Sequence, residues 1–165
     1  MIVLGIDPGS QNTGYGILDC QGNNNPGCLT YGNIGLNPRE DFYLRLKEIY
    51  DKIEQLILQH QPVHVAFEDV FFSRNIKVAL HLGQARGAAI IAALNHKRQI
   101  FSYSPREIKQ ALTGHGNASK EQIKRMAENI LQVDLEGYPL DVSDALSIAI
   151  CHAFRWKTIS QGSSD

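Results

Sequence analysis

The sequence has few cysteines and no long hydrophobic run. Its three cysteines, Cys20, Cys28 and Cys151, are odd in number, and their spacing matches no metal-ligand motif. Such thiols are typical of reduced cysteines in a cytosol. No stretch approaches the roughly 18–20 uninterrupted apolar residues of a membrane span, and the start "MIVLGI" lacks the features of a secretion signal. We therefore expect a cytoplasmic protein that does not enter a membrane.

Several common catalytic motifs are also missing. None of the six histidines forms a zinc-binding pair of the His-Glu-x-x-His kind. The segment "DPGSQNTG" has no Gly-Lys-Ser or Gly-Lys-Thr, so it is not a P-loop, and the chain has no serine or cysteine nucleophile elbow. These absences leave the carboxylates as the main candidates for catalysis.

Positive charge is concentrated in one part of the chain. The net charge is −1, but residues 74–125 contain ten Lys or Arg and only two acids, which gives this segment +8 and the remainder −9. Such a distribution indicates either an anionic partner for one surface or ordinary solvated helix faces.

Apolar patterning predicts one α/β domain over residues 1–156, followed by a flexible tail over 157–165. Strands are expected at 2–7, 14–19, 28–36, 63–67 and 100–103. Helices are expected at 38–60, 76–95, 105–112, 119–132 and 141–155. Hairpins give antiparallel neighbours and helical crossovers give parallel ones. The order therefore predicts a mixed five-stranded sheet, with three antiparallel and then two parallel strands, flanked by helices.

Two helix starts carry local signals. Pro38 suits the first turn of the first helix. Ser119 with Gln122 has the pattern of a capping box at the start of the fourth helix.

Four acids stand where these elements begin or end. Asp7 ends the first strand, Glu68 ends the fourth, and Asp141 and Asp144 open the last helix on one face. Each has a plain alternative: a turn former at Asp-Pro-Gly, a surface residue just past a strand, and acids favoured by the dipole of a helix start.

Together the four acids indicate a metal site. The first and fourth strands are the expected central parallel pair, so Asp7 and Glu68 can lie side by side, with Asp141 and Asp144 packed near them. Carboxylates this close raise one another's pKa, and hard divalent cations relieve their repulsion. Two Mg²⁺ or Mn²⁺ ions, ~4 Å apart and bridged by Asp7, would suit phosphoryl transfer. The glycines after Asp7 would keep the following turn small.

Several motifs, in order, resemble those of the RuvC-type Holliday-junction resolvases, from Ile2 to about His152. They are "GIDPGSQNTGYG", "FEDVFFSRN", "LGQARG", "GNASKEQ" and "DVSDALSIAI". The resemblance implies a ribonuclease-H-like fold and a bacterial homodimer that cuts four-way DNA junctions symmetrically with Mg²⁺ or Mn²⁺ during recombination and repair. It also implies a branch-migration helicase complex as partner.

The same resemblance implies roles for individual residues. The catalytic and metal-binding acids are Asp7, Glu68, Asp141 and Asp144, and periodicity alone does not choose Glu68 over its neighbour Asp69. Asp69 is a small departure from the family pattern, and it either tunes the metals or points away. Lys109 and Lys120 would lie near the scissile phosphate, although both could be ordinary solvated helix charges.

The segment after Glu68 is expected to meet DNA. The resemblance implies that Phe71 stacks on an unpaired base while Phe72 stays in the core, although both could be core residues. Arg74 and Asn75 would contact the DNA backbone. Gly83 and Gly87, four residues apart, indicate either tight packing on the sheet or a two-fold helix interface.

Two other classes of function remain as alternatives. The first is an ATP-dependent kinase or ATPase, whose phosphate loops also use Asp-x-Gly after a first strand. Those folds need two such lobes, and 165 residues supply only one. The second is a junction-binding module without catalysis, which the presence of all four acids disfavours.

Overall fold

A mixed five-stranded sheet runs through the centre of the molecule. The computed structural model describes residues 1–22, 25–69 and 75–162. The strands are β1 (Ile2–Asp7), β2 (Asn12–Asp19), β3 (Gly27–Gly35), β4 (His64–Glu68) and β5 (Gln99–Tyr103). Their order is β3-β2-β1-β4-β5, with β1 antiparallel to β2, β2 antiparallel to β3, and the pairs β1–β4 and β4–β5 parallel. The predicted mixed sheet is confirmed.

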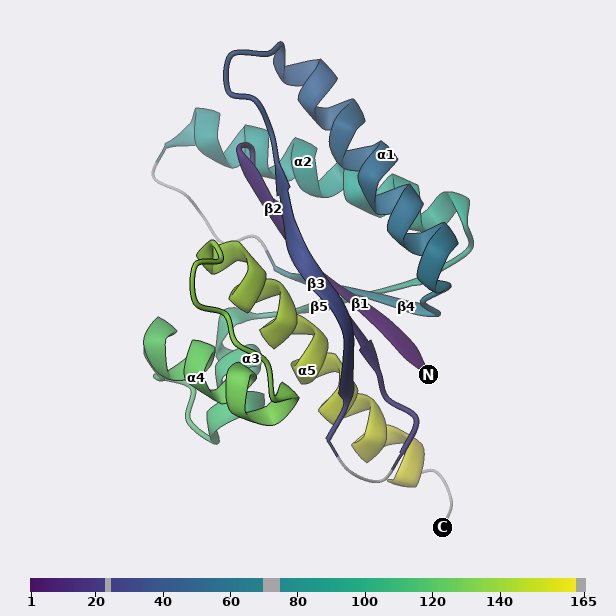
Figure 1. Ribbon diagram of the computed structural model, residues 1–165, viewed down its shortest axis with the longest axis vertical. Helices are drawn as coiled ribbons and strands as arrows, with labels where there is room; N and C mark the ends of the chain where they lie inside the picture. Colours follow the sequence, from purple (N-terminus) through teal and green to yellow (C-terminus); the bar gives the residue numbers. More distant parts are fainter. Residues whose placement is uncertain (23–24, 70–74, 163–165) are drawn as a thin grey trace.

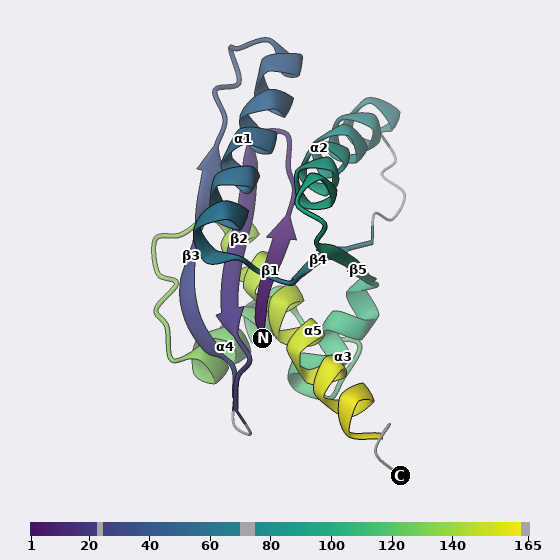
Figure 2. The same cartoon turned by 90° about the vertical axis from the view of Figure 1, so that its right-hand side faces the viewer.

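Helices cover both faces of this sheet (Figure 1). They are α1 (Phe42–His60), α2 (Ile76–Asn95), α3 (Pro105–Thr113), α4 (Lys120–Leu131) and α5 (Leu140–Gly162). Figure 2 shows α1 and α2 on one face and α5 on the other, with α3 and α4 packed beside α5. The long helix α5 therefore lies between the sheet and the two short helices.

The period-two alternation of the strands divides the core into two layers. On β1, Leu4 and Ile6 are buried against α1 and α2, whereas Val3 belongs to the layer beneath α5. On β4, Phe67 faces the first layer and Ala66 the second. By the same alternation, the last residue of each strand faces α5 and is a carboxylate, Asp7 on β1 and Glu68 on β4.

Two helix ends differ from the sequence prediction. Helix α1 begins at Phe42 and not at 38, because Asp41 caps it by accepting a hydrogen bond of 2.8 Å from the amide of Tyr43. Helix α5 continues to Gly162, so the expected boundary at residue 156 falls inside a helix. The capping box of Ser119 is confirmed, since its side chain accepts from the amide of Gln122.

No helix within the described ranges is both long and apolar enough to cross a membrane.

Candidate active site

Asp7 and Glu68 lie next to each other at the ends of two parallel strands. Strands β1 and β4 pair in register up to Ile6 and Phe67, and the two acids follow directly. Both acids face α5 by the alternation of their strands. The sequence prediction that the first and fourth strands form the central parallel pair is confirmed.

Glycines allow the backbone of α5 to approach the sheet closely. A Cβ atom built on Gly14, the β2 partner of Asp7, would overlap the backbone carbonyl of Asp141. One built on Gly5 of β1 would overlap the carbonyl of Ala145 in the same way. The first turns of α5 therefore lie directly on β1 and β2, which brings Asp141 and Asp144 to the strand ends.

The turn after Asp7 is compact for a similar reason. A Cβ atom on Gly9 would overlap the carbonyl of Asn12 and would stand 3.7 Å from Oδ1 of Asp141. Thr13 closes the turn, because its hydroxyl accepts from the amide of Gly9 at 3.3 Å. The expectation that glycine keeps this turn small is confirmed at Gly9.

The four acids share one electrostatic environment. Burial, together with the negative charges of Asp144, Asp141 and Glu68, raises the pKa of Asp7 to about 8. The pKa of Glu68 is raised by burial and then by Asp144, while the pKa of Asp144 is raised chiefly by burial. A carboxyl group with a pKa near 8 is mostly protonated at neutral pH unless a cation lies beside it.

Two lysines line one cavity together with two of the acids. Lys120, at the first residue of α4, forms an ion pair of 3.2 Å with Asp144, which raises the pKa of the lysine. Lys109, on α3, lowers the pKa of Glu68 through its positive charge. A cavity of about 210 Å³ brings these four side chains together, and its other lining residues are Pro105, Ile108, Ile123, Ser147 and Ile148.

The chemistry of the four acids, Asp7, Glu68, Asp141 and Asp144, fits a hard divalent cation. All of them offer carboxylate oxygen, which Mg²⁺ and Mn²⁺ prefer over the nitrogen and sulfur ligands typical of zinc. Within the described parts of the chain, no group of three or more His, Cys, Asp or Glu side chains is arranged to hold a metal ion as it stands. The carboxylates are close enough to change one another's pKa, and the metal site expected from the sequence stays a prediction.

Asp69 points away from this cluster. Its carboxylate lies 3.7 Å from the guanidinium of Arg86 on α2, and Arg86 also donates a hydrogen bond of 2.7 Å to the hydroxyl of Ser102 on β5. The guanidinium packs over the ring of Phe67 as well. Arg86 therefore holds the ends of β4 and β5 from the opposite face. Sequence reasoning did not single out Arg86, because helical periodicity alone does not show its partner.

The residues predicted to meet DNA are only partly described. Phe71, Phe72 and Arg74 lie outside the described residues. Asn75 is the N-cap of α2, and its side chain accepts a hydrogen bond of 3.3 Å from the amide of Val78. The structure thus shows a capping role for Asn75, and its DNA contact stays a prediction.

Known proteins share both the sequence and the fold. The family model described as "Crossover junction endodeoxyribonuclease RuvC" matches residues 3–152. A protein of that name from Alkaliphilus oremlandii is 44% identical over 153 residues, covering 93% of each chain. Another from Pseudoalteromonas translucida is 51% identical over 156 residues, covering 92% of this chain and 86% of the relative.

Solved structures agree with these sequence matches. The RuvC structure from Thermus thermophilus superposes with a TM-score of 0.87 at 33% identity, covering 96% of each chain. The same protein in complex with a Holliday junction substrate gives a TM-score of 0.86 at 30% identity, again covering 96% of each chain. The family model, the sequence relatives and the solved structures all point to the same family, and the sheet and the acid cluster agree with it. The chain therefore belongs to the RuvC family of crossover junction endodeoxyribonucleases.

Proposed function

We propose that this protein is an endonuclease that resolves four-way DNA junctions by paired, symmetric, metal-dependent hydrolysis of phosphodiesters in recombination and repair. One observation carries the proposal: acids from two other segments, β4 and α5, act on the pKa of Asp7 at the end of β1 in a chain of the RuvC family. The solved complex of the Thermus relative with a Holliday junction supports the choice of substrate.

Asp7, Glu68, Asp141 and Asp144 would hold Mg²⁺, two ions per site, with Mn²⁺ as a substitute. When bound, such ions activate water and stabilise the leaving oxygen of a phosphodiester. The raised pKa values of Asp7, Glu68 and Asp144 support this assignment, because carboxylates that are buried and repel one another are stabilised by a bound cation.

Lys109 and Lys120 would bind the phosphate that is cut. Both line the cavity that contains Glu68 and Asp144, so a phosphate reaching the acids would meet their ammonium groups. The side chain of Lys120 is 71% exposed, and its ion pair with Asp144 therefore contributes little to stability and can exchange for DNA. Donors aimed at a developing negative charge stabilise the transition state.

The residues after Glu68 would contact the junction. We assign base stacking at the junction centre to Phe71, and contacts with the DNA backbone to Arg74 and Asn75. Their place in the sequence, directly after a catalytic acid, supports this assignment. A branch-migration helicase complex as partner is likewise a proposal that rests on the family.

Phe71→Ala should slow junction cleavage by at least about tenfold while leaving duplex binding within twofold, because stacking is worth roughly 1–3 kcal/mol per base. Cleavage rates at saturating junction and duplex dissociation constants check this. An unchanged cleavage rate would remove the stacking role.

We also propose that two copies pair through α2. Leu80, Gly83, Gly87, Ile91 and Leu94 follow one another at spacings of four and three, and the three large residues are between 51% and 62% exposed. Among the described residues, a Cβ atom on Gly83 or Gly87 would meet nothing within 4 Å, so these glycines do not pack on the sheet. An exposed apolar stripe with small residues at its centre suits a second helix, and a two-fold pair would present two sites to a symmetric substrate.

Leu80→Glu should convert the dimer to a monomer, because it places a charge on this apolar stripe, next to the glycines at its centre. Sedimentation velocity measures the change. The matched control is Leu58→Glu on α1, where the leucine is 53% exposed and lies outside the stripe. A dimer that persists in Leu80→Glu would exclude α2 as the interface.

The decisive experiment for the function compares two substrates. Labelled four-way junction and linear duplex are incubated with the protein in Mg²⁺ or in a chelator. We expect paired symmetric nicks in the junction, with Mg²⁺ only. Equal cutting of both substrates, or cutting in the chelator, would contradict the proposal. ATP-dependent kinase activity is the alternative that measurable nucleotide binding would favour.

A further inference from the structure

A cluster of rings lies beneath the parallel half of the sheet, away from the acids. His152 of α5 is fully buried and His64 of β4 is 5% exposed. Nε2 of His152 lies 2.8 Å from Nδ1 of His64, and Nδ1 of His152 lies 2.7 Å from the hydroxyl of Tyr103 on β5. Phe101 and Trp156 pack against the histidine rings. Three elements therefore meet through two directional contacts.

These contacts constrain each other. A neutral imidazole has one donor and one acceptor nitrogen. His152 therefore donates one of its two hydrogen bonds, to Tyr103 or His64, and accepts the other. Burial keeps both rings neutral, since it lowers the pKa of His152 to about 4 and also lowers the pKa of His64. The result is a chain of two hydrogen bonds with one direction, in which both histidine rings are buried.

The chain connects the two structural elements that carry Glu68 and Asp144. Tyr103 is the register partner of Glu68 in the β4–β5 pair, and its carbonyl accepts from the amide of Asp69 at 2.8 Å. His152 lies eight residues after Asp144 on the same face of α5, a distance of about 12 Å along the helix. A shift of α5 along the sheet would therefore move Asp144 relative to Glu68 and break the Tyr103–His152 bond.

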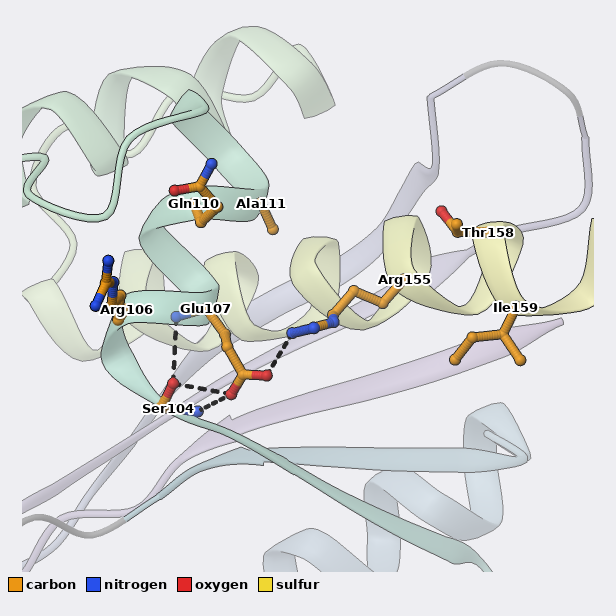
Figure 3. A pocket seen from close by; sticks show the side chains of 8 residues that line it. All are labelled: Ser104, Arg106, Glu107, Gln110, Ala111, Arg155, Thr158 and Ile159. Carbon is orange, nitrogen blue, oxygen red and sulfur yellow. Dashed lines mark hydrogen bonds and ion pairs between the residues drawn. The ribbon is translucent and has the colours of Figure 1, made fainter. Parts of the chain in front are cut away.

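Tyr103 also leads directly into α3, which carries Lys109. Ser104 caps this helix, and Glu107 reaches back to the amide and hydroxyl of Ser104 while pairing with Arg155 of α5 (Figure 3). The guanidinium of Arg155 lies over the ring of Tyr103, 5.7 Å from its centroid. These contacts form one wall of a cavity of about 540 Å³ between α3 and α5. Sheet, α3 and α5 are thus joined at Tyr103.

Toward β1 and β2, α5 makes close van der Waals contacts instead. Gly5 of β1 meets the backbone of Ala145 and the methyl group of Ala149, and Leu146 lies against Gly16 of β2. Apolar contacts of this kind are non-directional, whereas hydrogen bonds weaken steeply once their geometry is lost.

From these contacts we propose that Tyr103 and His152 are positioning residues, which fix α5 along the sheet and so set the spacing of Asp144 from Glu68 for metal binding. The inference rests on the proposed function, because it assigns the metal to these acids.

The test uses Tyr103→Phe in the full chain, which removes one hydroxyl and keeps the ring. The matched control is Tyr50→Phe, which also removes one hydrogen-bonded hydroxyl, since Tyr50 contacts Glu54 and Asn95 on the α1–α2 face of the sheet. Titration of Mn²⁺ by calorimetry, without DNA, measures metal affinity, and thermal unfolding in a chelator measures stability. We expect Tyr103→Phe to weaken Mn²⁺ binding at least threefold and Tyr50→Phe to leave it unchanged, although both lower the Tm by a similar amount.

A second variant, His152→Phe, removes both hydrogen bonds and should weaken Mn²⁺ binding at least as much as Tyr103→Phe. In single-turnover cleavage, both variants should need more Mg²⁺ for half-maximal rate, with the junction dissociation constant in the chelator unchanged. Wild-type Mn²⁺ affinity in a folded Tyr103→Phe protein would overturn the proposal. Because the calorimetry needs no cleavage, a wild-type protein that binds Mn²⁺ but cuts no junction would contradict the proposed function and leave the positioning role supported.

Discussion

Asp7→Asn should abolish junction cleavage and, in a chelator, make the protein more stable than the wild type. Asp7 is the acid on which the other three act, and burial with their charges raises its pKa to about 8. Asparagine has a similar shape but carries no charge, so it removes the repulsion together with a ligand for the proposed metal. Cleavage should fall by at least about 1,000-fold, because the loss touches the reacting groups directly, while junction binding should remain.

The stability gain should depend on pH in a defined direction. Between the ordinary pKa of an aspartate, near 4, and the folded value of about 8, the native protein holds a proton on Asp7 that the unfolded chain has lost. The contribution of Asp7 to stability is therefore complete below pH 4 and is lost as the pH rises to 8. Asp7→Asn should gain on the order of 3 kcal/mol at pH 8 and almost nothing at pH 4.

Thermal unfolding in a chelator at pH 5 and pH 8 checks this dependence, with an expected rise of ~6–12 °C at pH 8. The control is Asp51→Asn, since Asp51 forms an exposed ion pair with Lys47 on α1, remote from the acids. It should change neither cleavage nor the pH dependence of the Tm. A less stable Asp7→Asn protein at pH 8 would show that the acid cluster is not under electrostatic strain.

The sheet and most of the helices followed from the sequence because their signals are local. A near-continuous apolar run identified β1, Pro62 and the following segment "VHVAF" identified β4, and a turn cluster separated β2 from β3. The start of α1 was predicted wrongly, because Pro38 and Asp41 are both good helix-start residues and only the bond from Tyr43 to Asp41 decides between them. The end of α5 was missed for lack of a stop signal.

The site was predictable only in part, for a different physical reason. Four acids at element ends could be found by position, but position alone does not choose between Glu68, the last residue of β4, and Asp69, which follows it. The direction of Asp69 depends on its ion pair with Arg86, 17 residues distant in sequence. The bond between Tyr103 and His152 spans 49 residues and has no local pattern. Such pairs depend on how elements pack, and helical or strand periodicity carries no information about them.

The close approach of α5 to the sheet is the second feature with a large expected effect, and Gly14→Ala tests it. Gly14 pairs with Asp7, and its added methyl group would overlap the backbone carbonyl of Asp141. Backbone cannot turn aside as a flexible side chain can, so the start of α5 must move away from β2. Asp141 and Asp144 would then leave Asp7, and misplacement by about 1 Å can cost on the order of 100-fold in rate.

We expect Gly14→Ala to lower cleavage at least ~100-fold and to destabilise the protein by about 3 kcal/mol, or ~6–12 °C in Tm. Gly27→Ala is the matched control, because Gly27 lies in the neighbouring strand β3 and, within the described part of the chain, a Cβ atom there would meet nothing nearer than the carbonyl oxygen of Asp19 at 4.0 Å. It should leave cleavage and Tm close to wild type. Full cleavage by Gly14→Ala would mean that the acids of α5 do not depend on direct contact between helix and sheet. A loss of rate in the folded variant, with junction binding intact, would instead show that the lack of a side chain at Gly14 determines the positions of Asp141 and Asp144.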